Sequence, residues 1–304
     1  MSTSTDTKTF SQLWGYVGVM AAVLIWSGWI IATRDSVTRN LLPIDIAILR
    51  YGVPALFLAP VWLRKGIFPK GESPLLLAIM TLGWGGPFVY LISSGLLHVP
   101  AYLFGPLVPG LLPMVVAAFG VLILGEKING MRWLGLAFIA AAVVLVVGPS
   151  LATGDIDIMA GAPWLVTAAC GWAAFTIAYR YTNLTGVEAA AYVCLYSLPL
   201  LALGAYVDGA QIMTLSLDAM LWQGFIQGVL SGIGSVVGYA YAVRALGLPR
   251  ASAFTSLVPP LAAVGGWLIL GEAVSPTGWA SVICACLGVY LVNRAVAQSA
   301  AKGA

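Results

Sequence analysis

Long apolar runs separated by short polar connections dominate the pattern along this chain. A helix needs about 20 apolar residues to cross the hydrocarbon core of a bilayer. Runs of this kind span residues 13–33, 43–63, 74–96, 99–124, 130–149, 160–180, 186–206, 219–243, 250–271 and 276–293. We therefore predict an all-α polytopic membrane protein with ten transmembrane helices, joined by connections too short to hold a soluble domain.

The composition supports lipid as the solvent for this fold. Hydrophobic residues make up 61% of the 304 residues and charged residues only 8%, whereas a soluble domain carries roughly 25% charged residues. The net charge of +3 is too small to indicate a nucleic-acid partner. We expect the partners to be the lipid bilayer and a small-molecule substrate, and we infer no obligate protein partner.

The basic residues predict the orientation of the chain, because short cytoplasmic connections carry an excess of Lys and Arg. With the N-terminus in the cytoplasm, only Arg34 and Arg39 face outward, and Arg50 lies within a span. The other basic residues then face the cytoplasm: Lys8, Arg64, Lys65, Lys70, Lys127, Arg132, Arg180, Arg244, Arg250, Arg294 and Lys302. We predict that both termini are cytoplasmic.

The segment Leu-Ile-Leu-Gly-Glu occurs at residues 122–126 and again at 268–272, which defines an offset of 146. The same offset aligns further identical residues without a gap: Trp26 with Trp172, Ala32 with Ala178, Arg34 with Arg180, Leu111 with Leu257, Pro113 with Pro259, Ala117 with Ala263, Gly120 with Gly266 and Trp133 with Trp279. It also aligns Asn129 with Ser275, and both are good helix N-caps. We predict two five-helix repeats, residues 1–149 and 150–304.

Because five is an odd number, the second repeat enters the membrane from the opposite side. Inverted repeats of this kind are typical of secondary transporters, in which the two halves open a central site to each side in turn. Glu126 and Glu272 each follow a helix, where they can accept hydrogen bonds from the first N–H groups of the next one. They are either parts of an inherited hairpin turn or gating residues. The hinge and gating candidates are Gly83, Pro87, Pro113, Glu126, Pro259 and Glu272.

The repeat carries a recognisable set of residues: Trp26, Trp172, Pro113, Glu126, Trp133, Pro259, Glu272 and Trp279. With ten helices in two copies, this pattern resembles the EamA-type branch of the drug/metabolite transporter superfamily over essentially the whole chain. The resemblance implies a carrier of the bacterial-type inner membrane, commonly an exporter of amino acids or related metabolites. It is specific for the superfamily and does not identify the substrate.

Arg50 is the clearest ionisable residue within a span, and such residues are expensive in lipid and often functional. It lies seven residues after Pro43, which corresponds to a depth of about 10 Å at 1.5 Å per residue. Two interpretations are open. Arg50 either reaches outward or bonds to nearby carbonyls, or it faces a central cavity and attracts the carboxylate of a substrate.

The eleven Asp and Glu residues all fall in connections or near helix ends. Proton-coupled export of cationic drugs usually requires a buried carboxylate that exchanges a proton for the cation, so that mechanism is disfavoured. A sugar-phosphate carrier would be expected to place several Lys or Arg in its site, and only Arg50 is available.

Aromatic and small polar residues on several spans are suited to line a pocket for an amphipathic solute. The stretch Gly-Trp-Gly-Gly-Pro at 83–87 predicts a break in its helix, which frees backbone polar groups for other helices. The prolines around Tyr102 predict a bent helix. Core packing is the competing interpretation for each residue. The cavity candidates are Trp26, Arg50, Trp84, Tyr90, Tyr102, Trp172, Tyr179, Gln227, Ser231, Ser235, Tyr239 and Ser256.

Catalytic chemistry is poorly supported. The single histidine, His98, leaves no histidine cluster for a metal and no Ser-His-acid set, and the four cysteines lack ligand spacing and are expected to fill the core. We expect no cofactor and no metal. The favoured function is export of amino acids, aromatic or large apolar ones first. The alternatives are export of nucleobases or drugs, a channel, and a membrane-embedded enzyme or lipid-handling protein.

Overall fold

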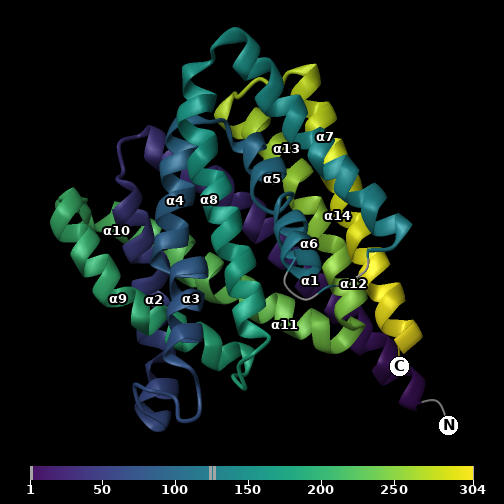
Figure 1. The fold of residues 1–304 in the computed structure, drawn as a ribbon. Helices are drawn as coiled ribbons and strands as arrows, with labels where there is room; N and C mark the ends of the chain where they lie inside the picture. Colours follow the sequence, from purple (N-terminus) through teal and green to yellow (C-terminus); the bar gives the residue numbers. More distant parts are fainter. Residues whose placement is uncertain (1–2, 123–124, 126–127, 304) are drawn as a thin grey trace.

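Helices make up all the regular structure in the computed structural model, which describes residues 3–122, 125 and 128–303 (Figure 1). The helices are α1 (Thr3–Thr38), α2 (Pro43–Lys65), α3 (Pro74–Trp84), α4 (Gly86–His98), η1 (Ala101–Leu103), α5 (Phe104–Leu107), α6 (Leu112–Leu122), α7 (Gly130–Thr153), α8 (Ile156–Tyr179), α9 (Gly186–Asp208), η2 (Ile212–Thr214), α10 (Leu217–Gln223), η3 (Gly224–Gly234), α11 (Ser235–Leu246), α12 (Leu248–Phe254), η4 (Thr255–Leu257), α13 (Val258–Leu270) and α14 (Pro276–Gly303).

Ten stretches of these helices are long and apolar enough to cross a membrane. They are Gln12–Thr38, Pro43–Lys65, Pro74–His98, Ala101–Leu122, Gly130–Thr153, Ile156–Tyr179, Gly186–Asp208, Leu217–Leu246, Arg250–Leu270 and Pro276–Val296. Each overlaps one predicted span, so the all-α fold with ten candidate spans is confirmed. The single histidine, His98, is the last residue of α4.

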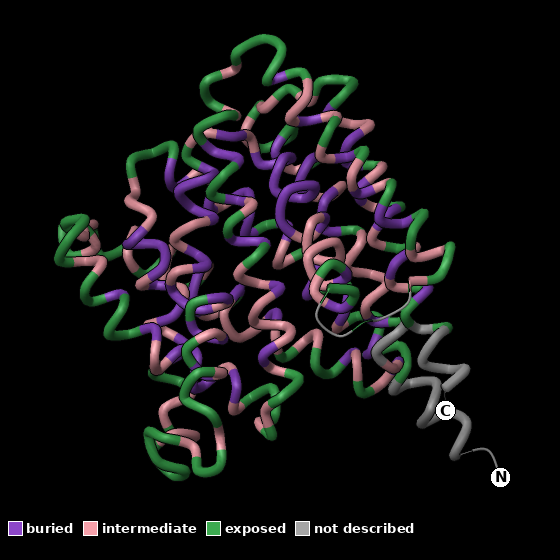
Figure 2. The backbone as a smooth tube through the Cα atoms, viewed as in Figure 1, coloured by how far each residue is buried: buried purple, intermediate pink, exposed green. Residues whose placement is uncertain are grey.

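Large apolar side chains are exposed on the outside of the bundle. Leu56, Phe57 and Leu203 expose 77%, 63% and 61% of their surface, while the buried backbone is concentrated in the interior (Figure 2). Apolar surface left in water costs about 25 cal/mol per Å². A bilayer removes this cost, so the exposed side chains fit the membrane-spanning fold.

The third span is interrupted where the sequence predicts it. Helix α3 ends at Trp84, α4 begins at Gly86, and Gly85 between them is extended. The freed groups find partners on other spans. The Trp84 carbonyl accepts a hydrogen bond from the Tyr51 hydroxyl of α2, and the Gly86 N–H donates to Ser197 Oγ of α9 over 2.9 Å.

The other irregular spans follow the same internal symmetry. The fourth span is bent through η1 and α5, and the ninth through η4. The eighth span contains an eleven-residue π-helical segment, η3, which the sequence does not predict. Adding 146 to the number of Gly85 gives Ser231, which lies inside η3. Both repeats therefore depart from regular α-helix at the same place.

Helix contacts reproduce the inverted relation between the repeats. Gly135 of α7 packs on Gly288 of α14, where an added Cβ would lie 2.8 Å from the Gly288 carbonyl oxygen. The residues equivalent to Gly135 and Gly288 at the offset of 146 are Ser281 and Ala142. These two are also in contact: Ser281 Oγ donates to the Ala142 carbonyl over 2.7 Å. Two such exchanged contacts are expected of a pseudo-twofold axis lying in the membrane plane.

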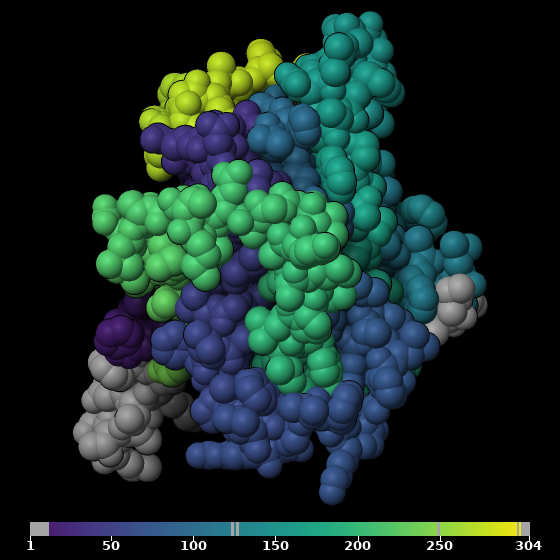
Figure 3. Space-filling model, turned by 90° about the vertical axis from the view of Figure 1, so that its left-hand side faces the viewer, coloured from purple at the N-terminus to yellow at the C-terminus, as the bar shows by residue number. Residues whose placement is uncertain are grey.

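The connections gather at two ends of the molecule. Figure 1 shows the start of α1, the end of α14 and the 66–73 connection at the bottom, and the α7–α8 and α13–α14 connections at the top. From the predicted distribution of Lys and Arg, we call the bottom the inner end and the top the outer end. Seen from the side in Figure 3, α9 and the α10–η3–α11 segment flank α2.

Candidate functional site

Arg50 is a half-buried residue of α2 that contacts residues of α1 and η3. Its guanidinium carbon lies 5.6 Å from the ring centroid of Trp29 and 6.0 Å from that of Tyr51. Its Nη1 atom approaches Gly232, where an added Cβ would be only 2.9 Å away. Nε has no hydrogen-bond partner, and no ion pair joins Arg50 to an acid within the described residues. An unpaired guanidinium stacked on aromatic rings is suited to bind a carboxylate.

A chain of polar side chains runs from the Arg50 region toward the outer end. Trp29 Nε1 donates to Gln227 Oε1 over 2.6 Å. Gln227 donates in turn to Gln223 over 3.4 Å, and Gln223 donates to Ser36 Oγ over 2.9 Å. These bonds join α1 to the eighth span and explain why Gln227 can be fully buried. They also hold the Trp29 ring in place beside Arg50.

Three aromatic rings form a stack near the break in the third span. Trp84 lies against Phe175 with ring centroids 4.9 Å apart, and Phe175 against Tyr179 at 6.0 Å. The Trp84 backbone is tied to Tyr51, the neighbour of Arg50. The cation and the aromatic stack are therefore linked through a single side chain.

The remaining aromatic candidates lie in separate pairs. Trp26 contacts Tyr239 at a centroid distance of 5.3 Å, and Trp172 contacts Phe88 at 5.9 Å. Tyr90 packs on Trp164 at 6.4 Å, and Tyr102 is buried at the outer end, close to Gly278. Trp26, Trp172, Tyr90 and Tyr102 belong to or pack against the same hydrophobic core as Trp29 and Tyr51. Among the described residues, the rings found over the Arg50 guanidinium are those of Trp29 and Tyr51.

The predicted polar stripe on the eighth and ninth spans is largely satisfied within its own helices. Ser235 donates to the Ser231 carbonyl over 2.6 Å, and Ser256 donates to the Ala253 carbonyl over 2.7 Å. Ser231 differs, since of these three serines it is the one whose hydroxyl oxygen is buried without a hydrogen-bond partner in the described structure.

A cluster at the outer end, which we call the outer lock, joins four spans through Arg34 and Glu272. Arg34 Nε donates to Glu272 Oε1 over 2.7 Å, although 238 residues separate the two. Arg34 Nη1 donates to the carbonyls of Leu96 and Leu97 over 2.6 and 3.0 Å. Glu272 Oε2 accepts from the Ala101 N–H over 2.8 Å. The lock therefore connects α1, α4, η1 and the α13–α14 connection.

The partner of Glu272 differs from the prediction. The sequence predicts that its carboxylate accepts from the helix that follows it, α14. It bonds instead to the first N–H of η1 and to Arg34, because the inverted fold brings the start of the fourth span against the end of the ninth. Ser275 caps α14 in its place, accepting from the Gly278 N–H over 3.1 Å. Glu126 lies outside the described residues.

The other hinge candidates lie at helix junctions or crossings. Gly83 allows α3 to cross α8 closely, since an added Cβ would be 2.2 Å from the Gly171 carbonyl oxygen. Pro87 is in the first turn of α4, and Pro113 begins the straight part of the fourth span. Pro259 packs on Gly105 of α5, with an added Cβ only 2.4 Å from the Pro259 Cβ. None of these contacts tests a hinge role, which stays a prediction.

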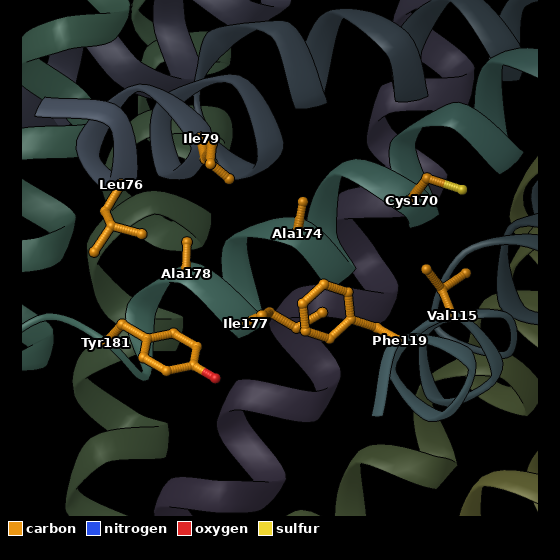
Figure 4. Close-up of a pocket in the computed structure, with 9 residues that line it drawn as sticks. All are labelled: Leu76, Ile79, Val115, Phe119, Cys170, Ala174, Ile177, Ala178 and Tyr181. Carbon is orange, nitrogen blue, oxygen red and sulfur yellow. The ribbon is translucent and has the colours of Figure 1, made fainter. Parts of the chain in front are cut away.

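A cavity of about 330 Å³ lies near the inner end, between α3, α6 and α8 (Figure 4). Its lining is almost entirely apolar: Leu76, Ile79, Val115, Phe119, Cys170, Ala174, Ile177, Ala178 and Tyr181. Cys170 is exposed, so the expectation that all four cysteines fill the core is wrong for this one. Among the described residues, no group of His, Cys, Asp or Glu could hold a metal ion.

The cavity candidates predicted from the sequence include Arg50 but not Trp29, Tyr51 or Phe175. Trp29, Tyr51 and Phe175 meet it or its neighbours, and Arg34 completes the outer lock. A signal for the lock exists in the repeat, since the offset of 146 aligns Arg34 with Arg180 and Glu272 with Glu126. Matched basic and acidic residues at equivalent helix ends are candidates for an ion pair.

Comparisons with known proteins agree with this architecture. The chain is 27% identical over 247 residues, 79% of each protein, to a "probable terminal-alkyne amino-acid exporter" of Streptantibioticus cattleyicolor. It is 25% identical over 295 residues to "Protein RarD" of Streptomyces exfoliatus, covering 88% of this chain and 80% of that one. A solved structure has the same fold, with a TM-score of 0.56 and 16% identity over 93% of this chain and 96% of the other.

The model of one transporter family matches the chain twice, over residues 13–148 and 159–294. The two matches are themselves offset by 146, as the internal repeat is. Together they cover most of the ten spans. The chain belongs to the EamA-like transporter family.

Proposed function

We propose that this transporter exports amino acids, aromatic or large apolar ones first, across a bacterial-type inner membrane by alternating access between its two repeats. The observation that carries this proposal is the unpaired guanidinium of Arg50 inside the bundle. A cation inside a membrane span without an ion-pair partner is costly. A substrate carboxylate would supply the missing partner and make charge-assisted hydrogen bonds.

The surroundings of Arg50 favour an aromatic or large apolar side chain on the same solute. The Trp84–Phe175–Tyr179 stack offers ring faces near the break in the third span. No described Asp or Glu lies in the middle of a span to pair with an ammonium group, but aromatic faces attract cations within about 6 Å. A zwitterion with an apolar side chain suits this combination.

One relative supports the same substrate class, since its printed name is that of an amino-acid exporter. At 27% identity, pocket residues can differ while the fold persists. The name therefore supports the amino-acid proposal without identifying which amino acid this chain carries.

The test uses purified protein in liposomes and measures counterflow of labelled tryptophan and phenylalanine. Losing a hydrogen bond to a charged group costs roughly 1.5–3 kcal/mol, so Arg50→Ala should reduce tryptophan transport roughly ten- to hundredfold. Arg50→Lys should retain part of it. The control is Arg39→Ala, which removes an exposed arginine at the outer end. Unchanged tryptophan transport by Arg50→Ala, at an equal reconstituted amount, would contradict the proposed role.

A second comparison isolates the carboxylate. Tryptamine has the ring and the ammonium of tryptophan but no carboxylate, so it should compete weakly with tryptophan in the parent protein. Arg50→Ala should lower tryptophan transport toward the tryptamine level and leave tryptamine itself little changed. Repeating the measurements with and without a pH gradient distinguishes facilitated diffusion from proton coupling.

The alternatives predict different outcomes in the same vesicles. A carrier of nucleobases or organic cations would saturate with those solutes and ignore amino acids. A channel would give non-saturating flux without counterflow. A lipid-handling protein or membrane-embedded enzyme would show no solute flux.

A further inference from the structure

The outer and inner ends of the molecule differ in how equivalent helices pack. At the outer end, Gly105 of α5 touches Pro259 of α13. The equivalent residues at the inner end are Ala251 of α12 and Pro113 of α6. In the described part of the chain, α12 and α6 have no more than isolated contacts. In the residues that the structure describes, the fourth and ninth spans therefore pack closely at the outer end and make at most isolated contacts at the inner end.

The first and sixth spans show the same difference. α1 packs along α4 near the outer end, whereas its counterpart α8 has at most isolated contacts with α11, the counterpart of α4, among the described residues. Ile31 of α1 is buried against Gly265 of α13, where an added Cβ would be 2.3 Å from Ile31 Cδ1. Its counterpart Ile177 lines the inner cavity instead, together with Phe119, the counterpart of Gly265 (Figure 4).

The outer lock holds the closed end together with groups that are mostly shielded from water. The side chains of Arg34 and Glu272 expose only 16% and 14% of their surface. Shielding from solvent strengthens their attraction relative to an ion pair on the surface. The three backbone groups bonded to the pair belong to α4 and η1, so any separation of α1 from the fourth or ninth span must break it.

We propose that Arg34 and Glu272 form the outer gate of the transport cycle, closed in this inward-open state and broken whenever the inner end closes. In the other state, α12 packs on α6 and α8 packs on α11, in the arrangement that their counterparts show here at the outer end. Arg180, the counterpart of Arg34, then donates to the carbonyls of Ala242 and Val243, the counterparts of Leu96 and Leu97. The inference requires alternating access but no particular substrate.

The experiment follows crosslinking in liposomes and needs no solute, so its outcome is independent of the proposed amino-acid specificity. Cys170, Cys194, Cys284 and Cys286 are first replaced by alanine. An outer reporter, Ile31→Cys with Gly265→Cys, and an inner reporter, Pro113→Cys with Ala251→Cys, are then built in separate proteins. A short bifunctional thiol reagent should crosslink the outer pair rapidly and the inner pair slowly.

Substituting Glu272 should reverse the relative crosslinking rates of the outer and inner cysteine pairs. Coupling between two such states is typically worth a fivefold to 150-fold shift. We expect Glu272→Ala to slow crosslinking of the outer pair and to speed that of the inner pair about tenfold, with Glu272→Gln intermediate. The matched control is Asp35→Asn, which breaks the exposed Asp35–Arg39 ion pair at the end of α1 and should change neither rate. Size-exclusion profiles identify any variant that fails to fold, in which case Glu272→Gln decides.

Two results would overturn the proposal. One is an inner pair that crosslinks as fast as the outer pair in the starting protein, because the inner end would then not be open. The other is a folded Glu272→Gln or Glu272→Ala protein whose two rates match those of Asp35→Asn.

Discussion

At the scale of single residues, Tyr51 connects the backbone of the third span to the guanidinium of Arg50. Its hydroxyl donates to the Trp84 carbonyl, which the break at Gly85 leaves without a helical partner. Its ring lies 6.0 Å from the guanidinium of Arg50. An unsatisfied carbonyl in a bilayer interior costs free energy because no water can replace the lost bond.

We therefore expect Tyr51→Phe to lower the stability of the protein. Leaving a buried acceptor unpaired costs roughly 1–3 kcal/mol, which should appear as a lower melting temperature in detergent. The control is Tyr196→Phe, because Tyr196 bonds to the Ile67 carbonyl at an exposed site over 2.6 Å, where water can take over. Equal melting temperatures for both variants would show that the Trp84 carbonyl does not depend on Tyr51.

The same residues show what the sequence could and could not predict at this scale. A charge in an apolar run is conspicuous, so Arg50 was identifiable from the pattern alone. Its neighbours Trp29 and Tyr51 were not, because apolar helices give little indication of how each is rotated about its axis. The Arg34–Glu272 pair required knowing that residues 238 apart in sequence meet at one end.

At the scale of helices, close crossings depend on glycine. α3 crosses α8 where Gly83 faces the Gly171 carbonyl, with 2.2 Å between that oxygen and an added Cβ. Helices in lipid associate largely through packing, and small residues at the crossing let the backbones approach. Gly52 of α2 differs, because nothing lies within 4 Å of an added Cβ there.

Gly83→Ala should consequently destabilise the bundle, and Gly52→Ala should not. Overpacking a tight contact costs typically 1–3 kcal/mol, whereas alanine in an open helical position is neutral or slightly stabilising. Melting temperatures and the yield of monodisperse protein after detergent extraction would measure the difference. If Gly83→Ala melts with the parent protein, the helices can move apart at no measurable cost and the crossing is not tight.

The positions of the helices could be predicted from the sequence better than their departures from regular α-helical geometry. The Gly-Trp-Gly-Gly-Pro stretch predicts the break between α3 and α4 because proline and adjacent glycines disfavour a continuous helix. The π-helical segment η3 contains no proline, and its extra backbone width depends on how the eighth span packs on α2 and α1. Local sequence carries no comparable signal for it.

At the scale of the whole molecule, some contacts between the two repeats obey the internal symmetry and others do not. The contacts between α7 and α14 are exchanged symmetrically by the offset of 146. Among the described residues, close packing between the fourth and ninth spans is found at the outer end, and at most isolated contacts at the inner end. A duplicated chain with one asymmetric region has two equivalent arrangements available, which is the physical basis for alternating access.

This symmetry requires that equivalent connections lie on opposite faces of the membrane. Asn129 and Ser275 are equivalent and exposed, and each precedes the last span of its repeat. We expect a membrane-impermeant maleimide to label Ser275→Cys in intact cells and Asn129→Cys only after permeabilisation, in the cysteine-free background. Met213→Cys at the outer end and Lys70→Cys at the inner end serve as markers for the two faces, since both residues are exposed. Labelling of both test positions from one face would mean that the repeats run parallel, and the exchanged contacts between α7 and α14 would then have no symmetric origin.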